Sequence, residues 1–151
     1  LFPADKLLVR APLLMASGAA NAVKQIAEEA VQKGAEVAKQ ALDNTNYIGY
    51  KSFYRFNKAY GTAGKGYAWH HIVEQNRSNL SKFGAEAIHN INNLIKLPHG
   101  KGSIHSKVSA YYSSIRSFTN GKTVREWLNT QSYEAQYEFG IKILKLYGWN
   151  Q

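Results

Sequence analysis

The chain contains five histidines, and all of them fall within one short stretch of the sequence, at positions 70, 71, 89, 99 and 105. There is no cysteine, so a transition-metal site built by this chain would have to use imidazole and carboxylate ligands. Neutral imidazole also accepts and releases protons near pH 7. The histidine cluster is therefore the strongest candidate for acid–base or metal chemistry.

Three short segments would position these histidines. The run 66–74 is rich in β-forming residues and predicts a strand that carries the adjacent histidine pair. The apolar run 92–98, which opens with asparagine and closes with proline, predicts a second strand. Ser103 then predicts the N-cap of a helix, with His105 in its first turn.

The adjacent pair His70 and His71 raises a geometric problem. Neighbouring residues of a regular strand point to opposite faces, so such a strand cannot aim both imidazoles at one phosphate. Either the strand ends at the pair, or one of the two histidines has a supporting role.

The order strand, connection, strand, helix, with paired histidine, asparagine and helix-borne histidine, resembles the HNH (ββα-metal) nuclease motif. It is most similar to the branch marked by Trp-His-His at the tips of contact-dependent inhibition and Rhs-type polymorphic toxins. The resemblance covers about residues 66–116. It is carried by Trp69-His70-His71, Ile88-His89-Asn90, Asn93-Leu94-Ile95, Leu97-Pro98, and Ile104-His105 with Tyr111-Tyr112-Ser113-Ser114.

The resemblance implies an α+β fold with a ββα-metal core, an N-terminal helix and a C-terminal pair of helices. It also implies a divalent metal ion (Mg, Zn, Ni or Mn) as cofactor. In such a site His70 would be a metal ligand and His71 the general base. Asn93 would orient the base or pin the loop, and His105 would supply a further ligand or hold the phosphate at the helix N-terminus. Glu74 is either a catalytic or ligating carboxylate or an exposed residue after the strand.

The chain departs from the family pattern at the second helix histidine, where it has Ser109. The candidate replacement is His99, whose glycine-bearing loop could wrap back onto the metal. Lys101 in the same loop could instead bind phosphate directly. With only His70 and His105 secure, the site could also work without metal, using two histidines and a lysine for RNA transesterification. His89, after Ile88 in a polar turn, is better explained as a hydrogen-bonded structural histidine.

Charge is distributed unevenly along the chain. Residues 1–45 hold five Lys or Arg and five Asp or Glu, whereas residues 46–151 hold fourteen and five and so carry the whole net charge of +9. A basic domain attracts polyanions. Solubility or an acidic protein partner would explain the charge equally well. If nucleic acid is bound, the predicted contacts are Lys96, Lys101, Lys107 and Trp69.

The remaining segments read as scaffold. An alanine-rich helical pattern predicts a linker or docking segment over 1–45, outside a domain over 46–151. The stretch 46–66 mixes Tyr and Phe with Lys and Arg, which can stack on bases but more often forms a core face with basic residues turned outward. A capping box at Thr123 and a Ser132 cap predict two C-terminal helices, the second ending near Gly148. No run is long enough to span a membrane.

Together these observations predict an endonuclease acting on DNA or tRNA. By the resemblance it would be the tip of a larger secreted or cell-surface toxin, active in the cytoplasm of a competing bacterium and neutralised by an acidic immunity protein. The start of the chain, without methionine or a signal peptide, agrees with a piece of a longer protein. The alternatives are a metal-independent tRNase, a non-catalytic nucleic-acid-binding module, and a protein-interaction domain with a basic face.

Overall fold

A two-stranded antiparallel hairpin lies at the centre of the computed structural model, which describes residues 48–150. Strand β1 (Tyr67–His71) pairs with β2 (Leu94–Pro98), so that His70 lies opposite Ile95 and His71 opposite Leu94. Both strands are shorter than the runs 66–74 and 92–98 that the sequence predicts. The predicted N-terminal helix and the 1–45 segment lie outside the described residues.

The connection between the strands contains two short helices that the sequence reading did not predict. Helix α3 (Arg77–Phe83) begins at Asn76, whose side chain accepts a hydrogen bond from the backbone of Asn79. Gly84 ends it with a φ of 86°, a conformation that favours glycine, and α4 (Ala85–Ile88) follows at once. This compact turn returns the chain to the start of β2.

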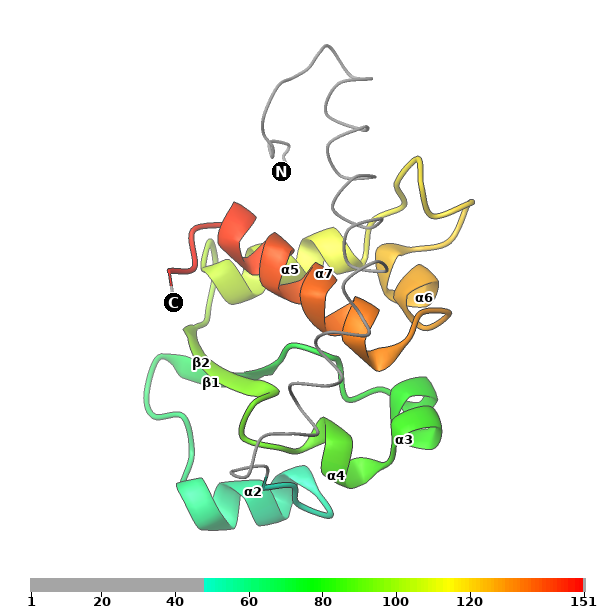
Figure 1. Cartoon of the computed structure of the whole chain (residues 1–151). Coiled ribbons are helices and arrows are strands. Elements are labelled where there is room, and N and C mark those ends of the chain that lie inside the picture. The colour runs from blue at the N-terminus through cyan, green and yellow to red at the C-terminus, as the bar shows by residue number, and fades with distance from the viewer. Residues whose placement is uncertain (1–47, 151) are drawn as a thin grey trace.

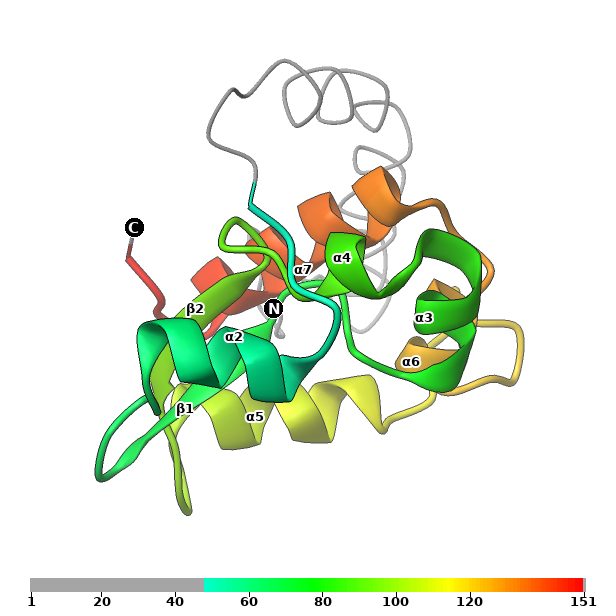
Figure 2. The same cartoon turned by 90° about the horizontal axis from the view of Figure 1, so that it is seen from below.

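Two helices flank the hairpin, one on each side (Figures 1 and 2). Helix α2 (Phe53–Tyr60) precedes β1 and is capped by Ser52. Helix α5 (Ile104–Tyr112) follows β2, and its predicted cap is confirmed, since the Ser103 hydroxyl accepts from the backbone of Ser106. The described residues therefore form a mixed α+β structure in which the hairpin presents a different face to each helix.

The C-terminal pair of helices is present and begins as predicted. The Thr123 hydroxyl caps α6 (Val124–Leu128) and the Ser132 hydroxyl caps α7 (Tyr133–Leu146). Gly148 follows α7 with a φ of 100°. Helices α5, α6 and α7 enclose the main core with the end of the hairpin. Its buried members are Ile72, Leu97, Val108, Tyr111, Tyr112, Val124, Leu128, Phe139, Ile143 and Leu144.

Helix α7 packs closely against the end of β1 at Gly140. A Cβ at this position would lie 2.9 Å from Cγ2 of Ile72 and 3.0 Å from its carbonyl oxygen. Glycine therefore permits a close approach that fixes the chain directly after the histidine pair. Within residues 48–150, no helix combines the length and apolar character needed to cross a membrane.

Candidate active site

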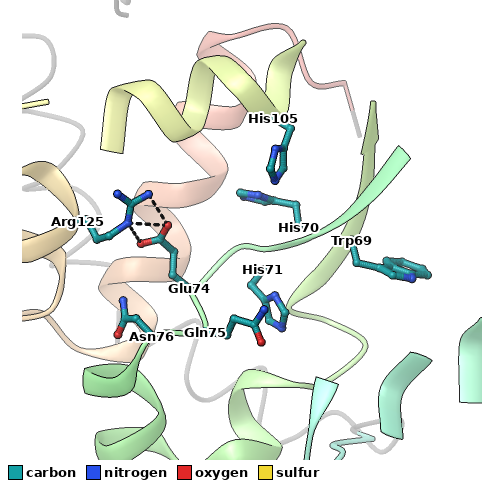
Figure 3. Close-up of a pocket in the computed structure, with 8 residues that line it drawn as sticks. All are labelled: Trp69, His70, His71, Glu74, Gln75, Asn76, His105 and Arg125. Carbon is teal, nitrogen blue, oxygen red and sulfur yellow. Dashed lines mark hydrogen bonds and ion pairs between the residues drawn. The ribbon is translucent and has the colours of Figure 1, made fainter. Parts of the chain in front are cut away.

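A pocket of about 280 Å³ opens at the end of β1, between the hairpin and the helices α5 and α6. It is lined almost entirely by polar side chains from three separate parts of the chain, and Figure 3 shows His70 and His105 pointing toward one another there. The lining residues are Trp69, His70, His71, Glu74, Gln75, Asn76, His105 and Arg125. Four of the five catalytic candidates from the sequence therefore border the same pocket.

His70 and His105 face each other across the pocket. Their ring centroids are 5.6 Å apart and the ring planes are perpendicular. His70 is buried at the end of β1, whereas His105 is half-buried in the first turn of α5. Burial, together with the proximity of His105, lowers the pKa of His70 to about 4. His70 is consequently neutral at pH 7, with a nitrogen lone pair available to a proton or a metal ion.

His71 lies on the opposite side of the strand from His70 (Figure 3). Its Nε2 is 3.1 Å from Nδ1 of His89, and its ring packs against Phe53 at a centroid distance of 5.0 Å. Burial, and then the nearby His89 and His70, lower the pKa of His71 to about 3. Burial also lowers the pKa of His89, so two neutral imidazoles share one hydrogen bond. His71 borders the pocket, but one of its nitrogens already has a partner.

Asn93 does not reach the pocket; it ties the two strands together beneath it. Its side-chain oxygen accepts from the backbone N–H of Val73 at 2.8 Å. Its amide nitrogen donates to the carbonyls of Val73 and Ile88, both at 2.9 Å. The side chain is fully buried, so these hydrogen bonds fix where β1 ends and β2 begins. Of the two roles the sequence left open, this geometry matches pinning of the loop.

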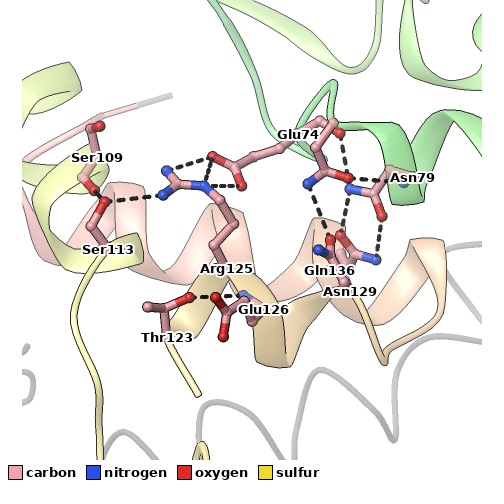
Figure 4. A network of polar contacts seen from close by, with 10 residues as sticks. Glu74, Asn79, Ser109, Ser113, Thr123, Arg125, Glu126, Asn129 and Gln136 are labelled. Atoms are coloured by element: carbon pink, nitrogen blue, oxygen red, sulfur yellow. Dashed lines mark hydrogen bonds and ion pairs between the residues drawn. The ribbon is translucent and has the colours of Figure 1, made fainter.

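Glu74 forms a bidentate ion pair with Arg125 of α6 (Figure 4). Arg125 Nε lies 2.8 Å from one carboxylate oxygen, and its Nη2 lies 3.0 Å from the other. Its Nη1 donates to the Ser113 hydroxyl at the end of α5. The guanidinium is thus held at the pocket wall by partners from two elements. The sequence reading missed Arg125 because the capping box places its helix but says nothing about what that helix packs against.

A second polar network holds the backbone of Glu74 (Figure 4). The Asn79 amide donates to the Glu74 carbonyl at 2.9 Å. Asn79 and Gln136 then exchange two amide hydrogen bonds, each 3.0 Å long, although both side chains are buried. Because every member of this group is satisfied, it rigidly joins α3, α7 and the pocket wall.

The remaining predicted site residues lie outside the pocket, apart from Trp69. His99 is exposed in the loop after β2, where its backbone N–H donates to Gly66. Lys96 places its ammonium 5.4 Å from the Trp69 ring centroid. Lys101 and Lys107 are also exposed. The structure thus brings His70, His105 and Glu74 together but leaves His99 apart from them.

Two of the three predicted metal ligands, His70 and His105, lie close together in this geometry. The paired imidazoles of His70 and His105 could supply two nitrogen ligands. Among residues 48–150, no three or more His, Cys, Asp or Glu side chains are grouped so that they could hold a metal ion. Comparisons with models of known families, with curated proteins and with solved structures find no match to the chain. Its functional interpretation therefore depends on the site itself.

Proposed function

We propose that this protein is an endonuclease that cuts nucleic acid in the pocket between β1 and the first turn of α5. The observation that carries the proposal is the His70–His105 pair, which two separate elements bring face to face across a polar pocket. In this proposal the hairpin followed by α5 is a ββα-metal core, as the resemblance of residues 66–116 to HNH nucleases implies.

The net charge of the described residues suits a polyanionic substrate. The described residues include all fourteen Lys or Arg residues of the basic segment and only five acids. The free backbone N–H groups at the start of α5 favour an anion beside His105. Arg125 supplies a fixed guanidinium at the opposite wall, already oriented by Glu74 and Ser113. A phosphate between these groups would meet donors on two sides.

The metal in this proposal is a divalent ion held by His70 and His105, with water and substrate oxygens completing its coordination. Neutral imidazole is a suitable ligand for Zn or Ni, and the low pKa of His70 keeps it neutral. When bound, such an ion would neutralise charge on the scissile phosphate. Glu74 is less available as a ligand because both of its oxygens bind Arg125.

The second candidate is a metal-independent RNase. It is favoured by the pairing of one neutral, buried imidazole with a second, half-buried one, since nucleic-acid cleavage by general acid–base catalysis needs both a proton acceptor and a proton donor. In that mechanism His70 would accept the proton of a ribose hydroxyl, and His105 would donate one to the leaving oxygen.

The role of His71 as general base stays a prediction. With its Nε2 committed to His89, only its Nδ1 would be left to act on a water molecule. We therefore assign the chemistry to His70 and His105. His71 instead connects the pocket to the aromatic side chains of α2.

The biological setting we propose is that of an antibacterial toxin tip. It would be delivered as part of a larger secreted or surface protein and would act in the cytoplasm of a competing bacterium. The net charge of +9 matches an acidic immunity protein, whose association should slow as salt is added. Support for this setting comes from the Trp-His-His resemblance and from the charge.

Incubating the purified chain with plasmid DNA and with tRNA, each with Mg²⁺, Mn²⁺, Ni²⁺, Zn²⁺ or EDTA, tests substrate and cofactor together. Cleavage that needs an added ion supports the metal-assisted mechanism. Cleavage of tRNA that persists in EDTA supports the second candidate. Salt-dependent binding without any cleavage would contradict both and leave a non-catalytic nucleic-acid-binding module.

A further inference from the structure

The outer surface of α2 carries a row of basic residues around one exposed tyrosine. Tyr54, Arg55 and Lys58 are exposed and spaced so that they lie on one face of α2, and the exposed Lys51 lies in the chain just before the N-cap Ser52. Tyr54 is the most exposed large hydrophobic residue described, at 70%, and the Lys58 ammonium lies 5.9 Å from its ring centroid. We call these four residues the α2 stripe.

Packing does not account for the stripe, because the inner side of α2 meets the needs of the core. Phe56 is 1% exposed and contacts Trp69 with ring centroids 5.0 Å apart. Phe53 contacts His71 on the same strand face. The sequence left two uses open for this segment, base stacking and packing in the core. The inner side of α2 packs in the core. The other side exposes an aromatic ring and cations to solvent.

The charge of the stripe is not balanced nearby in the sequence. Between residue 44 and residue 73 there is no Asp or Glu, and the acid that follows, Glu74, is paired with Arg125. Surface cations of a globular domain are usually interspersed with acids. Exposed cations beside an exposed aromatic ring have the chemistry of a surface that binds a single nucleic-acid strand.

We infer that the α2 stripe binds an unpaired segment of the nucleic-acid substrate, with a base stacked on Tyr54 and phosphates beside Arg55 and Lys58. This inference rests on the proposed function, which names nucleic acid as the ligand. An unpaired segment fits better than a duplex, because the bases of a duplex are already stacked on one another and offer no free face to a tyrosine ring.

Trp69 lies between the pocket and the inner face of α2. It lines the pocket and also packs on Phe56 of α2, while Lys96 lies over its ring. A strand cut beside His70 would therefore follow an aromatic and basic path around the edge of the hairpin to reach Tyr54. The stripe binds the substrate away from the cut bond and selects nucleic acid that has an unpaired region near it.

The test measures binding of the full chain to a short, fluorescently labelled oligonucleotide whose phosphorothioate linkages resist cleavage, offered as a single strand and as a duplex. The single strand should bind more tightly. Tyr54→Ala should weaken single-strand binding roughly tenfold, as expected when one stacked base is lost, whereas Tyr54→Phe should keep it. Arg55→Gln with Lys58→Gln should lower the slope of log affinity against log salt by about 1.4, or about 0.7 for each phosphate contact.

The matched control removes the same charge elsewhere, with Lys122→Gln and Lys145→Gln, both exposed and outside the stripe. Single-strand binding by Tyr54→Ala equal to that of the wild type, or a wild-type preference for the duplex, overturns the inference. Stripe-dependent binding to anionic lipid vesicles without single-strand binding does so too. If the chain binds single strands through the stripe but cleaves no nucleic acid, only the nuclease proposal is refuted. If the chain cleaves nucleic acid and the stripe variants bind as the wild type does, only this inference is refuted.

Discussion

His70 and His71 are neighbours in the chain and are buried to nearly the same extent, at 9% and 7% exposure, yet they belong to different parts of the molecule. His70 turns toward α5 and meets His105 at the pocket. His71 turns toward α2, where it meets His89 and the ring of Phe53. Alternation along one strand thus separates a site that can meet a substrate from a cluster that holds the fold.

The partners on each face explain the difference. The His70 face gathers charged groups whose ion pair keeps contact with solvent, since the side chains of Arg125 and Glu74 are 33% and 25% exposed. The His71 face is packed against aromatic rings from α2, although His71 itself still borders the pocket. A histidine pair in a sequence therefore identifies a strand end worth inspecting, but the helices packed on each side decide what each of the two histidines contacts.

The largest expected effect on stability comes from removing the Asn93 side chain, whose hydrogen bonds hold the ends of both strands. Asn93→Ala would leave the backbone N–H and carbonyl of Val73 and the carbonyl of Ile88 without partners in a buried position. At about 1–3 kcal/mol for each of these three groups, the free energy of unfolding should fall by at least about 3 kcal/mol. Urea unfolding followed by circular dichroism measures this loss.

Asn92→Ala is the matched control for that experiment. Asn92 is exposed. Its backbone N–H donates to Asn90 and its carbonyl accepts from Tyr137, and alanine keeps both groups. Its free energy of unfolding should stay close to that of the wild type. Equal stability of the two variants would show that the strands are held by something other than Asn93.

The second effect is a loss of stability in acid. Burial lowers the pKa of His71 to about 3 and that of His70 to about 4, from an ordinary value near 6.5. Below about pH 6.5 the unfolded chain takes up protons that these folded histidines do not, so the stability they contribute is complete above that pH. It is lost as the pH falls toward 4 and then 3.

Replacing His71 by Phe should remove up to about 1.4 kcal/mol per pH unit from the slope of unfolding free energy between pH 6 and 4. Unfolding curves at several pH values measure that slope, and an overall loss of stability does not disturb the comparison. His99→Gln, at an exposed position, should leave the slope unchanged. A His71→Phe slope equal to that of the wild type would show that the His71 face does not exclude protons.

Local signals in the sequence predicted the elements that their own capping residues define. Ser103, Thr123 and Ser132 each accept the expected backbone hydrogen bond, and the helices begin where those residues indicate. The two strands were also expected, because a run of β-forming residues and a short apolar run flank the connection. These features depend on residues a few positions apart, which a single sequence displays.

Features that depend on distant residues were not predicted. Arg125 meets Glu74 across the interface between α6 and the end of β1, and Asn79 meets Gln136 in the same way. Helix α2 was also missed, although Ser52 as a cap and the buried spacing of Phe53 and Phe56 would have indicated it. Its tyrosines and phenylalanines favour strands by propensity, and here the Ser52 cap and the packing of Phe56 outweigh that preference.

The smallest effect on stability is expected at Arg125. Its ion pair with Glu74 is partly exposed, so Arg125→Gln should cost less than about 1 kcal/mol of unfolding free energy. Nucleic-acid cleavage should nevertheless fall, mainly through a higher KM, because the pocket loses its fixed cation. Arg125→Lys should restore part of it, since lysine keeps the charge but not the two-pronged geometry. Steady-state cleavage assays decide this, and Arg125→Gln cleaving with a wild-type KM would place Arg125 in the scaffold.

The central claim is that the His70 face carries the chemistry, and His105→Ala tests it most directly because His105 is half-buried and contributes little to the core. Ser109→Ala, one turn further along α5 at an exposed position, is the control. We predict that His105→Ala melts as the control does but cleaves nucleic acid at least about 100-fold more slowly, because the variant loses either a metal ligand or, in the metal-independent mechanism, the group that donates a proton. A folded His105→Ala variant that cleaves at the control's rate would contradict the account.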